Sequence, residues 1–312
     1  MALATSTQSI ISLINRDVNK SLLAQVDLIT SEIQSGEKLI SLYMPHEAAD
    51  APALAHLIDG GWNKYNAIVF MSHWQQSMYN LFLGVPYSAG VVMPNAIVPV
   101  RKHKKPEDAI NLLFIGDPRN GLDIAFSAFK KLSPRNPNVM LYVFSDFSVL
   151  GNLKDKSNKL LANFHSEVRG HPKVIFNSDE SAYLGMTKRV AVFEKCHIYL
   201  FPNAVPHASH SPLLECMSAE MLCIHSSYAC LPEISLGLTS MYGFSEDREK
   251  HVNKFYLELD NVINLYSRSG PRRSLESKLA KDKIIVDQIY SWEKRMLQWN
   301  EFLLNLLTNR QK

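Results

Sequence analysis

The stretch Cys196–Glu233 decides the fold, and it reads CHIYLFPNAVPHASHSPLLECMSAEMLCIHSSYACLPE. A short apolar run at His197–Phe201 predicts a buried strand, and Leu222–His225 predicts a second one. Small and polar residues between them predict a loop that opens a helix over Pro212–Ala219, with Ser211 as its N-cap. This order of strand, loop, helix and strand indicates an α/β unit whose helix N-terminus faces a ligand crevice.

One acid interrupts the apolar side of that predicted helix. Glu215 lies about one turn into it, among Leu213, Leu214 and Met217. A carboxylate surrounded by apolar side chains needs a polar partner, because burying it alone is costly. Glu215 is therefore a candidate for binding a ligand, and the alternative is that it complements the dipole at the start of the helix.

The alternation of strand and helix continues towards the N-terminus of this stretch. Apolar strands between amphipathic helices predict a parallel sheet with right-handed crossovers. The other strands of this sheet are expected at Asn111–Gly116, Val139–Phe144 and Lys173–Phe176, and the helices at Leu122–Leu132, Ser157–Val168 and Ala182–Glu194. The C-terminal tail is expected to form helices over residues 246–268, 274–288 and 290–309.

A smaller α/β unit precedes this sheet. Residues 1–35 are expected to be helical, and short apolar runs follow at Lys38–Tyr43, Ala67–Met71 and Val91–Met93. The segment Pro94–Pro106 is rich in proline and lysine and marks a boundary. We therefore expect a reduced N-terminal domain over residues 1–100, a larger domain over 101–290, and a last helix over 291–312.

Composition excludes several classes of protein. Of the 312 residues, 46% are hydrophobic and 20% are charged, which fits a globular rather than a disordered chain. The formal net charge of +3 is too small to indicate nucleic-acid binding. No apolar run reaches the roughly 18 residues that a membrane span needs, and the N-terminus does not resemble a signal peptide. The four cysteines lack metal-ligand spacing, so we expect no disulfide, no metal site and a cytoplasmic protein.

A basic run, RKHKK at residues 101–105, has two interpretations. It is either a solvated linker between domains or a patch that binds phosphate or an anionic membrane surface. The second interpretation predicts a peripheral membrane contact.

The turn after the strand Asn111–Gly116 is a second candidate for ligand binding. It reads Gly116-Asp117-Pro118-Arg119-Asn120-Gly121 and leads into the next predicted helix. Glycines let the backbone approach a ligand, helix-start N–H groups bind phosphate, and Arg119 would add a bidentate contact. Such turns often serve only as turns, and no G-x-G-x-x-G dinucleotide fingerprint follows any predicted strand.

Four segments, in order, resemble the retaining family 4 glycosyltransferases of the GT-B fold. LLFIGDPRNGLDIAFSAFKKL (112–132) resembles the family's glycine turn and "RKGLD" helix. The segment from Tyr199 to Glu233 resembles its E-x7-E and "LPE" block. AIVFMSHWQQSMYNLFLGVPYSAGVVMPNAI (67–97) and YSWEKRMLQWNEFLL (290–304) resemble an N-terminal segment and the terminal helix that crosses back to the first domain. The resemblance covers roughly residue 38 onward.

The resemblance implies two Rossmann-like domains and metal-independent transfer of a hexose from a nucleoside diphosphate sugar with retention. It implies no other cofactor, a UDP- or GDP-linked donor, and a glycan, lipid-linked or protein acceptor. Glu215, the second Glu of E-x7-E, would accept hydrogen bonds from the ribose hydroxyls. The donor-binding residues implied by the aligned blocks are Gly116, Asp117, Arg119, Asn120, Ser209, His210, Ser211, Leu214 and Glu215, with Ser72, Asn95 and Glu233 as weaker assignments.

Several positions depart from the family pattern. The first Glu of E-x7-E falls on His207, which with His46 is assigned to the reaction centre. The turn's usual Arg and Lys fall on Asp117 and Asn120, which leaves Arg119 as the turn's cation. Losing two charge-assisted contacts to the diphosphate would weaken binding roughly a hundredfold or more. Lys188 and Arg189 are the expected substitutes for these cations.

These departures leave a second hypothesis open. The chain is either a glycosyltransferase or a catalytically degenerate GT-B subunit that binds a nucleotide sugar or scaffolds an active transferase. Because the N-terminal domain is short, a partner glycosyltransferase chain or a second copy of this chain would complete the acceptor site. A nicotinamide-dependent or epimerase Rossmann protein is disfavoured by the missing glycine fingerprint and the missing Tyr-x-x-x-Lys pair.

Overall fold

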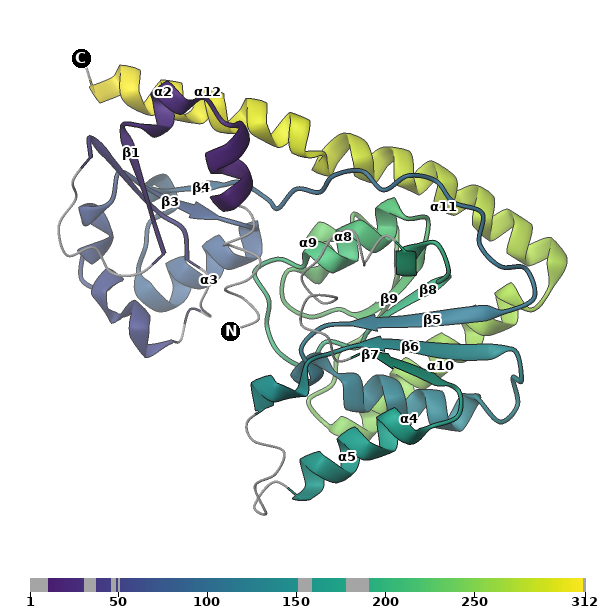
Figure 1. Ribbon diagram of the computed structural model, residues 1–312. Helices are drawn as coiled ribbons and strands as arrows, with labels where there is room; N and C mark the ends of the chain where they lie inside the picture. Colours follow the sequence, from purple (N-terminus) through teal and green to yellow (C-terminus); the bar gives the residue numbers. More distant parts are fainter. Residues whose placement is uncertain are drawn as a thin grey trace.

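The computed structural model describes residues 11–30, 38–45, 49, 51–150, 159–177 and 191–310. It contains two all-parallel sheets, which define an N-terminal and a C-terminal lobe (Figure 1). The sheet of the N-terminal lobe has the strand order β1-β2-β3-β4, and that of the C-terminal lobe has the order β10-β9-β8-β5-β6-β7. The predicted α/β class is confirmed.

The N-terminal lobe is built from short strands and few helices. Its strands are β1 (Val26–Ile29), β2 (Ile40–Tyr43), β3 (Ala67–Phe70) and β4 (Gly90–Val92), and its helices include α2 (Lys20–Leu23) and α3 (His73–Leu83). The prediction of continuous helix over residues 1–35 is wrong at β1. That segment is apolar and partly β-branched, and it pairs in parallel with β2 along its whole length. Residues 11–17 are helical as expected.

The C-terminal lobe follows the predicted alternation closely. Its strands are β5 (Ile110–Ile115), β6 (Val139–Phe144), β7 (Val174–Asn177), β8 (Ile198–Phe201), β9 (Leu222–Ser226) and β10 (Ser240–Tyr242). Its helices are α4 (Leu122–Leu132), α5 (Lys159–Gly170), α8 (Ser211–Ser218), α9 (Leu231–Ile234), α10 (Arg248–Tyr266) and α11 (Ser269–Tyr290). The sequence did not predict β10, and most of the helix predicted over Ala182–Glu194 lies outside the described residues.

The last helix, α12 (Trp292–Arg310), returns to the N-terminal lobe. Figure 1 shows α11 and α12 running one after the other along both lobes. Trp299 and Leu303 of α12 are buried in the apolar core of the N-terminal lobe. At the junction, Ile97 N donates to Tyr290 O (2.8 Å) and Trp292 N donates to Ile97 O (2.9 Å). The chain thus passes between the lobes twice, at adjacent places.

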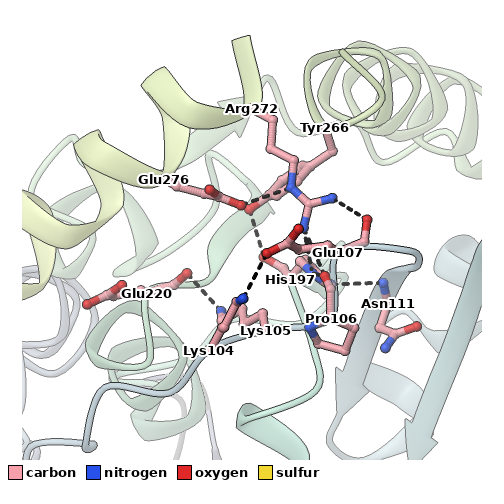
Figure 2. A network of polar contacts seen from close by, with 10 residues as sticks. All are labelled: Lys104, Lys105, Pro106, Glu107, Asn111, His197, Glu220, Tyr266, Arg272 and Glu276. Carbon is pink, nitrogen blue, oxygen red and sulfur yellow. Dashed lines mark hydrogen bonds and ion pairs between the residues drawn. The ribbon is translucent and has the colours of Figure 1, made fainter. Parts of the chain in front are cut away.

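The segment that links the lobes is held to the C-terminal lobe by a polar network (Figure 2). The Arg272 guanidinium donates to Glu107 O (3.0 Å) and Pro106 O (2.9 Å). The buried His197 ring accepts from Asn111 N at Nδ1 (3.1 Å), and its Nε2 lies 2.9 Å from Pro106 O. This contact requires the neutral Nε2–H tautomer, because one ring nitrogen must accept while the other donates.

Part of the basic run at 101–105 belongs to the same network. Lys105 Nζ donates to Glu220 O (2.8 Å), and burial lowers the pKa of Lys105 to about 8. Lys102 and Lys104 are exposed and form ion pairs with Glu220 (3.7 Å) and Glu107 (3.0 Å). Lys105 therefore anchors the linker and is not a surface charge. None of the described helices combines the length and apolar character that crossing a bilayer requires.

Buried neutral histidines predict a loss of stability in acid. Burial lowers the pKa of His197 and of His225 to about 4, whereas an unfolded histidine titrates near 6.5. Between these values the unfolded chain binds more protons than the folded one, so stability falls as the pH falls. The free energy of unfolding in urea should be lower at pH 5 than at pH 7 by about 2 kcal/mol for each such histidine.

The variant His225→Gln isolates one of these contributions. The His225 ring contacts Ser226 O (2.9 Å) and Thr239 Oγ1 (2.7 Å), and a glutamine amide can make polar contacts without titrating. Its unfolding free energy should depend less steeply on pH than that of the wild type. Equal slopes for the two proteins would contradict this explanation.

Candidate active site

The turn after β5 is pressed against the loop after β8. Gly121 begins α4 with φ +93°, and a Cβ atom at this position would lie 2.1 Å from Pro202 O. Only glycine fits here, because any side chain would strain the backbone and collide with the carbonyl. Both segments leave the carboxyl ends of neighbouring parallel strands, where α/β folds bind ligands.

A side-chain contact joins the same two segments. Nε2 of His207 lies 3.2 Å from Oδ1 of Asn120, and both residues are buried. Burial lowers the pKa of His207 to about 4, although the carboxylate of Asp117 acts in the opposite direction. His207 is therefore neutral at physiological pH. Its one N–H, on Nε2, faces the amide oxygen of Asn120, so towards a ligand it can accept a hydrogen bond at Nδ1 but does not supply a positive charge.

The cation of the turn is already paired. Asp117 is the N-cap of a short 3-10 helix, Pro118–Asn120, and its Oδ1 accepts from Arg119 N (2.9 Å). Arg119 Nε also donates to Oδ1 (2.9 Å) and Oδ2 (3.0 Å) of Asp117, and an Nη atom donates to Oδ2. This hydrogen bonding raises the pKa of Arg119. Of the predicted donor residues that the structure describes, Arg119 is the only cation, and a carboxylate neutralises it.

Helix α8 begins one residue earlier than predicted. Its N-cap is His210, so Ser211 is the first helical residue and not the cap. The His210 ring stacks on Phe201 with the ring centroids 3.7 Å apart, and its Nε2 lies 2.8 Å from Tyr199 Oη. Burial lowers the pKa of His210. The His210 side chain makes no capping bond, but its backbone O accepts from Leu213 N (3.2 Å), and Pro212 has no N–H.

The remaining predicted residues of this loop and helix are all buried. Glu215 lies in the middle of α8 with 9% of its surface exposed, and Leu214 packs in the apolar core of the C-terminal lobe. Ser209 Oγ is buried and has no hydrogen-bond partner among the described residues. The same holds for Nδ2 of Asn203, which the sequence analysis missed. The signal for Asn203 was available, since it is a polar residue directly after the strand that ends in Phe201-Pro202.

The N-terminal lobe contributes one predicted residue to this region. Nδ2 of Asn95 donates to Ser211 Oγ (3.1 Å), so the segment after β4 meets the first residue of α8. Ser72 is instead the N-cap of α3, where its Oγ accepts from Gln75 N (3.1 Å). The predicted site residues His46, Lys188 and Arg189 lie outside the described residues.

Glu233, a weaker donor-binding assignment, lies on α9 and contacts the N-terminal lobe. Its carboxylate accepts from His73 N (2.8 Å) and Trp74 N (3.0 Å), the first two residues of α3. Both oxygens are thus occupied by the N-terminal lobe. The described residues contain no cluster of three His, Cys, Asp or Glu side chains suited to binding a metal ion.

Comparison with known proteins gives no match to any family model or curated sequence. Solved structures do match. A glycosyltransferase from Rickettsia africae ESF-5 superposes with a TM-score of 0.69 and 13% identity, over 99% of this chain and 82% of the other. Anabaena HepE, solved with UDP and glucose, superposes with a TM-score of 0.64 and 13% identity, over 86% of this chain and 72% of the other. Pneumococcal O-GlcNAc transferase GtfA, solved with UDP and GlcNAc, superposes with a TM-score of 0.61 and 10% identity, over 86% of this chain and 57% of the other. A GtfA/B complex also matches, with a TM-score of 0.59 and 11% identity, over 86% of this chain and 53% of the other.

These similarities identify the fold. The chain has the GT-B glycosyltransferase fold, with two parallel-sheet lobes and C-terminal helices that span them. Identities of 10–13% do not extend the likeness to activity.

Proposed function

We propose that this protein is a glycosyltransferase that moves a hexose from a UDP- or GDP-linked donor to a glycan, lipid-linked or protein acceptor. In this proposal the transfer retains the anomeric configuration, needs no metal ion, and is assisted by the leaving phosphate of the donor. One observation carries the proposal. The turn after β5 and the loop after β8 meet at Gly121 and Pro202, and the His207 ring of that loop lies 5.5 Å from the ring of His210, the N-cap of the helix α8 that carries Glu215.

The roles of the residues follow from this geometry. A donor diphosphate would lie against the turn and the start of α8, where backbone N–H groups favour an anion. Glu215 would accept from the ribose hydroxyls. His207, neutral and held by Asn120 through Nε2, would accept at Nδ1 from a hydroxyl of the transferred sugar. Arg119 would stabilise charge on the leaving group once the diphosphate displaces Asp117 from it.

Two of the similar structures support the choice of donor class. HepE and GtfA were solved with UDP and a sugar, and both share the fold of this chain. GtfA also forms a complex with GtfB, which supports a partner transferase chain here, as an alternative to a homo-oligomer. We place the protein in the cytoplasm, with the exposed part of the 101–105 run as the region that would contact an anionic membrane.

A specific observation favours a second function. The pairing of Arg119 with Asp117 leaves the turn without a free charge, and His207 replaces an acid of the family pattern. A subunit that had lost catalysis would tolerate these features. In this alternative the chain binds a nucleotide sugar or scaffolds an active transferase without turning over the donor.

Activity and binding measurements separate the two functions. The proposed enzyme should bind UDP or GDP in calorimetry and should hydrolyse or transfer the matching nucleotide sugar. Glu215→Gln should weaken nucleotide binding about tenfold, because an amide retains only one good acceptor for the ribose. Glu301→Gln, at an exposed position of α12, is the matched control. Binding without turnover would support the scaffold, and an unchanged dissociation constant in Glu215→Gln would exclude the assigned ribose contact.

The variant Asp117→Asn tests the paired cation. Asparagine can still cap the turn, but it removes the negative charge that neutralises Arg119. The affinity for UDP or GDP should therefore rise roughly tenfold. Asp260→Asn, which breaks a 3.7 Å ion pair with Arg135 on the surface, should leave the affinity unchanged. An affinity that stays equal or falls in Asp117→Asn would show that Arg119 does not contact the diphosphate.

A further inference from the structure

The N-terminus of α3 belongs to one lobe and is capped by the other. Glu233 Oε1 accepts from His73 N (2.8 Å) and Oε2 accepts from Trp74 N (3.0 Å) across 160 and 159 residues of sequence. The next N–H of the helix, that of Gln75, is capped within the lobe by Ser72. A carboxylate on two N–H groups at a helix N-terminus is favoured by hydrogen bonding and by the helix dipole together.

Apolar packing accompanies this polar contact. The side chain of Trp74 packs against the apolar core of the C-terminal lobe, although it belongs to α3. Glu233 is held in place by its neighbours in α9, because Leu231 and Ile234 are fully buried in that core. Tyr290 Oη also donates to Ile234 O (3.0 Å). The carboxylate therefore projects from a fixed support towards the other lobe.

The same short helix adjoins the loop of the candidate site. Cys230, the residue before α9, donates its N–H to His207 O (3.4 Å). A second bond between the lobes, from Asn95 to Ser211, lies at the start of α8. The position of α3 relative to the C-terminal lobe is thus linked to the backbone of the candidate donor loop.

We propose that Glu233 is an interlobe latch, which by capping α3 keeps the two lobes in contact, the arrangement called closed below. Separating the lobes would break both of its hydrogen bonds and expose Trp74. Hydrogen bonds to a charged group are among the stronger ones, so loss of the carboxylate should lower the ratio of closed to open molecules roughly tenfold or more. The proposal rests on contacts between the lobes and does not depend on the chain's activity.

Amide hydrogen exchange measures directly whether Glu233 caps α3. In the protein without nucleotide, the amides of His73 and Trp74 should exchange slowly, since Glu233 accepts from both. They should exchange roughly tenfold faster or more in Glu233→Ala, and Glu233→Gln should fall between, because its single amide oxygen can cap one N–H. Glu246→Ala, at an exposed carboxylate of the same lobe, should match the wild type.

Double electron–electron resonance, which measures the distance between two spin labels, tests whether the lobes separate. Spin labels at Phe82→Cys and Leu160→Cys suit this, because these side chains are 59% and 87% exposed on different lobes, whereas all four native cysteines are buried. Glu233→Ala should broaden the interlobe distance distribution and shift it to longer values. The latch is disproved if α3 exchange and the distances are the same in Glu233→Ala, Glu233→Gln and Glu246→Ala. If Glu233→Ala unfolds, Glu233→Gln decides by the same two readouts.

Discussion

The close approach of Gly121 to Pro202 is the constraint on which the candidate site depends. With only a hydrogen atom in place of a side chain, the turn after β5 can lie directly on the carbonyl of Pro202, the first residue after β8. That contact brings Asn120 within reach of His207, in the same turn as the Asp117–Arg119 pair. A larger residue would separate the two segments, and the ligand-binding edge of the sheet would lose its shape.

The charge of the site differs from what its fold leads one to expect. A pocket for a diphosphate normally offers unpaired cations, but Arg119 is bound to Asp117 and His207 is neutral. Among the described residues, backbone N–H groups of the turn would supply the rest of the attraction for an anion, and they contribute partial charges only. In the proposed function a donor diphosphate would compete with the Asp117 carboxylate for the Arg119 guanidinium. This competition would set how tightly the site binds a donor.

Much of the C-terminal lobe was predictable from sequence, because strands such as β5 and β8 are buried on both faces and read as short apolar runs. Strand β1 was mistaken for helix because its four residues, Val-Asp-Leu-Ile, follow a helical pattern and are too few to show a clear period. Residue types predicted the glycine turn and Glu215 as site candidates. The pairing of Asp117 with Arg119, and the contact of Glu233 with α3, depend on side-chain direction and lobe placement, which sequence spacing does not encode.

A crystal structure with UDP and GDP supplied together tests the central claim most directly. We predict electron density for one nucleotide in the crevice between the Gly116–Gly121 turn and the start of α8. The ribose should lie within hydrogen-bonding distance of Glu215, and Arg119 should have turned from Asp117 to the phosphates. An empty crevice at saturating nucleotide, or a nucleotide bound elsewhere on the molecule, would contradict the account.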